Sequence, residues 1–127
     1  MTAFILGLCT TAAVIAVAEL FRKIDVKFFA SLNLAVIPFI YIGFSIDPHT
    51  LMLTIPSALL FLLFAYLGYK MNSMLTVIGL ALHGLWDVVF PHVSNVAPHG
   101  YDVFCLTIDV LLALYFYLKL KSVLSTQ

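Results

Sequence analysis

Long apolar runs alternate with short polar breaks along the whole chain. The hydrocarbon core of a bilayer is about 30 Å thick and is crossed by roughly 20 residues of helix. Apolar runs of that length cover residues 2–21, 28–46, 50–69, 72–90 and 101–120. The pattern therefore predicts an all-α integral membrane bundle of five transmembrane helices, forming a single domain over residues 1–127. Pro38 and Pro56 fall inside the second and third runs, where we expect kinks because proline has no N–H to donate.

Composition and charge limit the kinds of molecule with which the protein is expected to interact. Hydrophobic residues make up 64% of the chain and charged residues 9%, whereas soluble domains average about 45–50% and about 25%. The lipid bilayer is thus the expected surroundings. A net charge of zero and the lack of a basic run argue against nucleic-acid binding. Ala12 and Ala16 form a small-xxx-small pair, which permits a homo-oligomer or contact with a membrane partner protein.

The positions of the basic residues test the predicted number of spans, because five spans place the two termini on opposite sides of the membrane. All the basic residues fall on one side, namely Arg22, Lys23, Lys27, Lys70, Lys119 and Lys121. The other side receives Asp47, His49, His92, His99 and Asp102. Since lysine and arginine gather on the cytoplasmic side of a membrane, the distribution predicts an N-out, C-in orientation.

Ionisable residues inside the spans are functional candidates, because their burial in lipid is costly. Glu19 has Lys23 four residues on, so an ion pair along the first helix explains it. His83 and Asp87 are four residues apart and share one face of the fourth helix. A helical rise of 1.5 Å per residue places His83 and Asp109 at similar depths, roughly 10–12 Å below the outer surface. Asp87 and Cys105 lie at roughly 5–6 Å by the same reasoning.

These depths predict an outward-opening His/Asp pocket between the fourth and fifth helices. Trp86 and Cys105 would support it, and His92, His99 and Asp102 would lie at its mouth. One interpretation is structural, with the polar groups only holding helices together, as in a structural or accessory membrane subunit. Another is a proton or ion relay, although the inner half offers only Asn33 and Glu19 to continue a path.

The working prediction is a metal or small-ligand site, because imidazole and carboxylate together suit zinc or another transition metal. The candidate metal ligands are His83, Asp87, Asp109, His92 and His99. Three protein ligands with an open position would make the metal catalytic, and His83, Asp87 and Asp109 would then be the catalytic residues. The sequence leaves open whether the protein is an enzyme.

Two motifs carry a resemblance. The chain reads LHGLWDVV at residues 82–89, FCLTID at 104–109 and LALYF at 112–116. It resembles a family of small bacterial multi-pass membrane proteins of unknown function, which has a His-x-x-Trp-Asp motif and a later Cys-x-x-x-Asp. The resemblance implies a bacterial inner membrane location and covers mainly the last 50 residues or so. Family members often carry a His-His pair after the Trp-Asp, where this chain has Phe90-Pro91 and then His92.

Overall fold

The computed structural model describes residues 1–21, 23–94 and 96–124, and helices account for its regular structure. The helices are α1 (Thr2–Leu20), α2 (Val26–Val36), α3 (Phe39–Phe44), α4 (Pro48–Lys70), α5 (Met74–Val93) and α6 (Tyr101–Leu124). Because α2 and α3 follow each other as one span, the described residues form five helices long and apolar enough to cross a membrane. The prediction of an all-helical chain with five such spans is confirmed.

The three internal prolines act differently on their helices. At Pro38 the helix breaks, so that α2 ends at Val36 and α3 begins at Phe39, as expected where a backbone donor is missing. At Pro56 the expected kink does not divide α4, which runs unbroken from Pro48 to Lys70. At Pro91 the helix continues as well, because the Ser94 amide still donates to the Phe90 carbonyl oxygen at 2.9 Å. As a result α5 ends at Val93, three residues beyond the predicted end.

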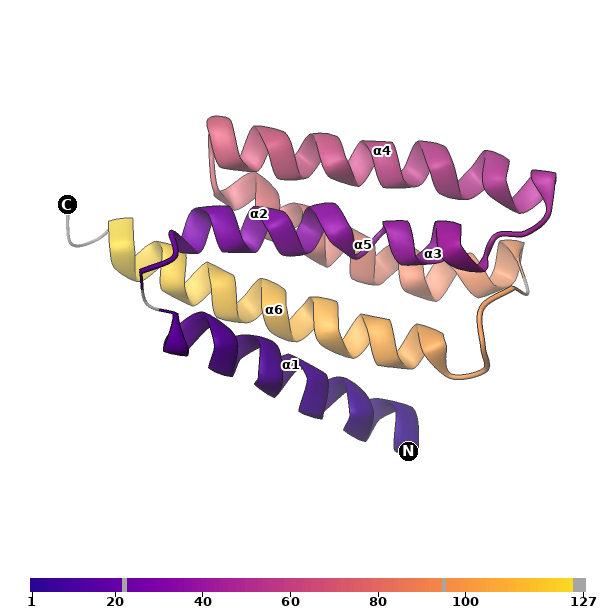
Figure 1. The fold of residues 1–127 in the computed structure, drawn as a ribbon, viewed down its shortest axis with the longest axis horizontal. Helices are drawn as coiled ribbons and strands as arrows, with labels where there is room; N and C mark the ends of the chain where they lie inside the picture. Colours follow the sequence, from indigo (N-terminus) through magenta and orange to yellow (C-terminus); the bar gives the residue numbers. More distant parts are fainter. Residues whose placement is uncertain (22, 95, 125–127) are drawn as a thin grey trace.

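Successive spans run in opposite directions, so the chain begins and ends at opposite ends of the bundle (Figure 1). The most extensive helix contact joins α5 and α6, while α1 packs on the other side of α6. Helix α2 packs mainly on α4, and α4 also contacts α5. The buried core accordingly centres on α6, with Leu112 and Phe116 fully buried.

The two ends of the bundle differ in charge. The end where α6 finishes carries the described basic residues Lys23, Lys27, Lys70, Lys119 and Lys121. Arg22 lies outside the described residues. The opposite end, where α4 and α6 begin, carries Asp47, His49, His92, His99 and Asp102. Between these ends the outward surface is apolar, with side chains such as Met52 (77% exposed) and Leu118 (57%) facing away from the bundle.

Candidate functional site

Three polar side chains meet in the core of the bundle. His83 and Asp87 come from α5, and Asp109 comes from α6. The His83 Nδ1 atom lies 2.6 Å from Asp109 Oδ2 and 3.6 Å from Asp87 Oδ2. One potential ligand atom from each residue lies within 4.8 Å of the other two, and all three residues are 0% exposed. We call this set the core triad.

The backbone of α5 allows the close approach that forms the core triad. His83 and Asp87 lie one helical turn apart and so point to the same side. Gly84 faces α6 beside them, and a Cβ atom there would lie 3.3 Å from both Asp109 Cβ and Leu106 Cδ1. A Cβ atom at this position would require these neighbours to shift by a few tenths of an ångström. The glycine therefore brings the carboxylate of Asp109 within hydrogen-bonding reach of the imidazole.

Tyr41 is a fourth member of the site that sequence reasoning missed. Its hydroxyl donates to Asp87 Oδ1 at 2.6 Å, and its ring centroid lies 4.3 Å from that of Phe90 and 6.2 Å from that of His83. Tyr41 belongs to α3, just after the break at Pro38, and is 2% exposed. A signal was available, since a buried tyrosine hydroxyl usually has a hydrogen-bond partner.

Aromatic side chains close the site on its other sides. Phe61 of α4 meets the His83 ring edge-on, with the centroids 4.8 Å apart. Towards the end of the bundle where α6 begins, Tyr101 packs against Tyr41 at 5.8 Å and against Phe44 at 5.0 Å. The expected pocket open to the outer surface is therefore replaced by a closed, fully buried site. Aromatic rings fill the space in which the sequence predicted an open pocket.

The other candidate residues lie outside the core triad. His92 is exposed, with its Nδ1 atom 3.0 Å from the Val88 carbonyl oxygen, and His99 is exposed in the segment before α6. His92 follows His83 by nine residues, and a turn of about 100° per residue places it on the opposite face of α5. Asp102, in the first turn of α6, is half-buried. Among the described residues, only the core triad gathers three potential ligands.

The two supporting residues flank the site without entering the core triad. Trp86 is half-buried and packs on Phe90, with centroids 5.9 Å apart. Cys105 is 5% exposed, one helical turn before Asp109 on α6. Its thiol is free of any disulfide. Both residues thus belong to the packing around the site.

Glu19 lies in a separate cluster at the lysine-rich end of the bundle. It forms an ion pair with Lys119 of α6, and the Tyr115 hydroxyl donates to the same carboxylate oxygen at 2.8 Å. The structure thus pairs Glu19 with a lysine of another helix, whereas the expected partner, Lys23, lies just past the end of α1. We call these three residues the Glu19 cluster.

The core triad has unequal numbers of acids and bases. Within the described part of the chain, the ion pairs of Asp87 and Asp109 are those with His83, and one imidazolium balances at most one carboxylate. His83 Nε2, Asp87 Oδ2 and Asp109 Oδ1 are buried and make no hydrogen bond to any residue that the structure describes. Buried ionised groups need a partner or a bound cation. The arrangement can therefore hold an additional proton or a metal ion.

Over the described residues, these features define an all-helical protein with five helices of membrane-spanning length and a buried His/Asp group. A model of a family of unknown function, DUF6010, matches residues 2–122, so the chain belongs to that family. The match extends well beyond the last 50 residues or so that carried the resemblance. Comparison with curated proteins and with solved structures gave no match.

Proposed function

We propose that the protein is an integral membrane protein that binds one divalent transition-metal ion, with zinc as the best chemical fit, at His83, Asp87 and Asp109. The observation that carries the proposal is the complete burial of these three side chains, with His83 Nδ1 lying 2.6 Å from Asp109 Oδ2 and 3.6 Å from Asp87 Oδ2. A dication bound by two carboxylates and a neutral imidazole leaves no net charge. It also supplies the positive charge that the site otherwise lacks.

The ligand types and spacing support zinc. Imidazole nitrogen and carboxylate oxygen bind Zn²⁺ at about 2.0–2.2 Å, so two ligands of one tetrahedral ion lie about 3.3 Å apart. The separation of His83 Nδ1 and Asp87 Oδ2, 3.6 Å, is close to that value. The 2.6 Å contact between His83 Nδ1 and Asp109 Oδ2 is shorter, as expected for a hydrogen bond. A metal ion would replace the proton in that hydrogen bond.

Tyr41 would set how Asp87 binds the ion. Its hydroxyl occupies Asp87 Oδ1, which leaves Oδ2 as the oxygen without a hydrogen bond. Such outer partners orient the ligands of metal sites and strongly influence metal affinity. Asp87 is therefore expected to act as a ligand through one oxygen only.

Elemental analysis of protein purified without chelator tests the proposal. We expect about one zinc per chain in the unaltered protein and none in His83→Ala. The matched control is His92→Ala, which removes a histidine from the opposite face of the same helix and should keep the metal. Circular dichroism checks that each variant stays helical. Absence of metal after growth and purification with added zinc, or equal metal in all three proteins, would contradict the proposal.

A second candidate function is proton binding, in which one carboxyl group of the core triad is protonated. The 2.6 Å hydrogen bonds from Tyr41 to Asp87 and between His83 and Asp109 favour it, because they join groups that exchange protons. Infrared spectroscopy of metal-free protein distinguishes the two. A carboxylic acid C=O band that persists when zinc is added and disappears in Asp87→Asn or Asp109→Asn would favour the proton.

The orientation in the membrane follows from the charge difference between the ends of the bundle. The lysine-rich end would face the cytoplasm and the segment between α5 and α6 would face outward. A chain with Cys9 and Cys105 replaced by serine gives a background for labelling intact cells with a membrane-impermeant maleimide. Ser94→Cys should react and Lys23→Cys should not. The reverse pattern would overturn the orientation.

A further inference from the structure

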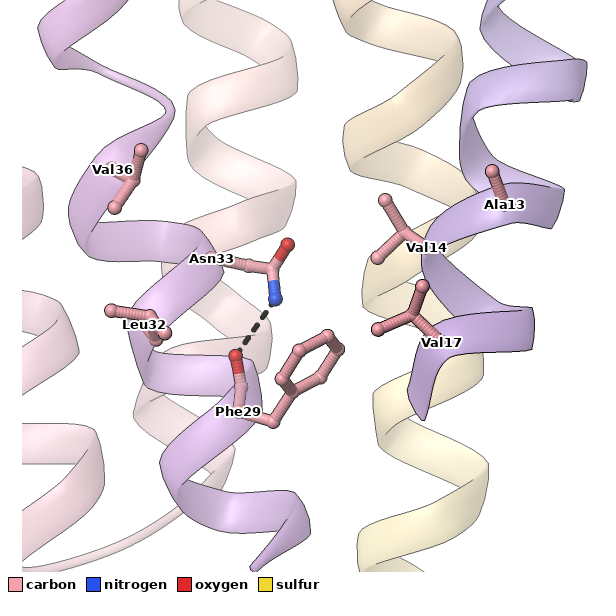
Figure 2. A pocket seen from close by; sticks show the side chains of 7 residues that line it. All are labelled: Ala13, Val14, Val17, Phe29, Leu32, Asn33 and Val36. Atoms are coloured by element: carbon pink, nitrogen blue, oxygen red, sulfur yellow. Dashed lines mark hydrogen bonds between the residues drawn. The ribbon is translucent and has the colours of Figure 1, made fainter. Parts of the chain in front are cut away.

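A groove separates α1 from α2. Val14 and Val17 of α1 form one wall, and Phe29, Leu32, Asn33 and Val36 of α2 form the other. Figure 2 shows Phe29 and Asn33 facing Val14 and Val17 across the space between the two helices. The groove has a volume of about 370 Å³, within the range of about 300–1,000 Å³ typical of small-molecule sites. We call it the α1–α2 groove.

One side chain of the groove is polar. Asn33 points from α2 towards α1 (Figure 2), and its Nδ2 atom donates to the Phe29 carbonyl oxygen at 2.8 Å. A carboxamide has two N–H donors and a carbonyl oxygen that accepts. The second donor and the oxygen of Asn33 make no other hydrogen bond among the described residues. One donor and one acceptor therefore remain available at the same place.

Leaving these two groups of Asn33 without hydrogen-bond partners is costly because of the depth of Asn33 in the span. Asn33 lies seven residues after Val26, where the second span begins, which is about 10 Å along the helix. The span is 19 residues long, or about 28 Å, so the amide lies in its middle third. Lipid acyl chains at that depth offer no hydrogen-bonding groups. A ligand that satisfies Asn33 must bring a polar atom into the apolar groove.

The lining of the groove favours an occupant that is mostly apolar. Of the seven lining residues, Asn33 is the one with a polar side chain. A molecule that matches this lining has a hydrocarbon body and a single polar group. A second copy of the chain is the alternative occupant, and the oligomeric state of the Asn33→Leu variant tells the two apart.

We infer that the α1–α2 groove binds a neutral lipid alcohol, an apolar chain whose hydroxyl group pairs with Asn33. A hydroxyl both donates and accepts, so it can donate to Asn33 Oδ1 and accept the second N–H at once. A carbonyl group could use only the donor. The groove lining carries no charged residue, which favours a neutral head. This site is separate from the core triad and does not depend on metal.

Binding of tritiated farnesol to the full chain in phosphatidylcholine nanodiscs tests the inference. We expect saturable binding of one farnesol per chain, with farnesene, which has the same skeleton without the hydroxyl, competing at least tenfold more weakly. Asn33→Leu should lower farnesol affinity at least tenfold, because it removes both hydrogen bonds to the hydroxyl. The dissociation constant of farnesene, obtained from its competition with farnesol, should be the same for Asn33→Leu as for the unaltered chain.

Two further variants control for folding and position. Val14→Trp fills the groove from α1 and should abolish binding of both compounds, whereas Leu85→Trp, at an exposed position on α5 (59% exposed), should leave both intact. Non-saturable farnesol binding, or binding unaffected by Asn33→Leu and Val14→Trp, would overturn the inference. It would also fail if Asn33→Leu converted a dimer into a monomer without changing farnesol binding, because the amide would then serve a second copy.

Discussion

Two carboxylate clusters lie along α6 and differ in how their charge is balanced. In the Glu19 cluster, the Tyr115 hydroxyl donates to Glu19 at 2.8 Å and Lys119 supplies a cation. In the core triad, the Tyr41 hydroxyl donates to Asp87 at 2.6 Å in the same manner. The side chains of Glu19 and Lys119 are each 38% exposed, whereas the two aspartates are fully buried.

The comparison shows which cluster needs a ligand. The Glu19 cluster pairs one carboxylate with a lysine near the end of the bundle, where water is available and an ion pair contributes little. The core triad holds two carboxylates and a single imidazole away from water. Hydrogen bonding by tyrosine is common to both clusters, so it does not distinguish them. The difference in charge balance is what supports the proposed cation site in the core.

The largest expected effect comes from removing the base of the core triad. His83→Leu leaves two buried carboxylates without a basic partner, and breaking such a buried pair costs about 3–5 kcal/mol. We expect that loss in the free energy of unfolding, measured by denaturant titration in detergent, together with loss of bound zinc. A loss below about 1 kcal/mol would mean that the core triad contributes no more to stability than an exposed ion pair does.

The two tyrosines give a matched test of burial. Tyr41→Phe removes a buried hydrogen bond to a carboxylate and should lower the free energy of unfolding by about 1.5–3 kcal/mol. Tyr115→Phe removes the equivalent bond in the half-exposed Glu19 cluster and should cost less than about 1 kcal/mol. Zinc affinity, measured by competition with a chelating dye, should fall only in Tyr41→Phe. Equal effects on stability would mean that burial does not distinguish the clusters.

A glycine substitution tests the close approach of α5 and α6. Gly84→Ala introduces a Cβ atom 3.3 Å from that of Asp109, and overpacking of this kind costs about 1–3 kcal/mol. We expect a lower melting temperature and weaker zinc binding. Gly43→Ala is the control, because a Cβ there would meet nothing within 4 Å. Unchanged zinc affinity in Gly84→Ala would show that the spacing of the triad is not critical.

The smallest expected effect is in the Glu19 cluster. Lys119→Met removes its cation while keeping a long side chain, and a partly exposed ion pair contributes less than about 1 kcal/mol. Both the unfolding midpoint and the zinc content should therefore stay close to those of the unaltered protein. Loss of zinc in Lys119→Met would show that the two clusters are coupled through α6.

Much of the fold could be predicted because apolar run length is a strong signal. The five spans follow from it directly, and their short connections imply that neighbours run antiparallel. The behaviour of individual prolines could not be predicted, since Pro38 divides a span while Pro56 and Pro91 do not. Their surroundings are similar in sequence, and the outcome depends on tertiary packing.

The candidate site was predicted in part. Depth along α5 and α6 brought His83 and Asp109 together, because helical rise fixes height in a short-looped hairpin. Depth along a helix does not fix how that helix is rotated about its axis, and it does not show which other helix packs beside the pair. Tyr41 was missed for that reason, and His92 was included although the continuation of α5 past Pro91 turns it to the opposite face.

Zinc-edge X-ray absorption of the zinc-loaded protein in lipid identifies the atoms that bind the ion. If the core triad holds the ion, the spectrum will show one imidazole nitrogen and carboxylate oxygens at about 2.0–2.2 Å, and Asp109→Asn will alter it while His92→Ala will not. Zinc binding at the core triad would be contradicted by a sulfur ligand from a cysteine. Two or more imidazole ligands, or the absence of bound zinc, would contradict it as well.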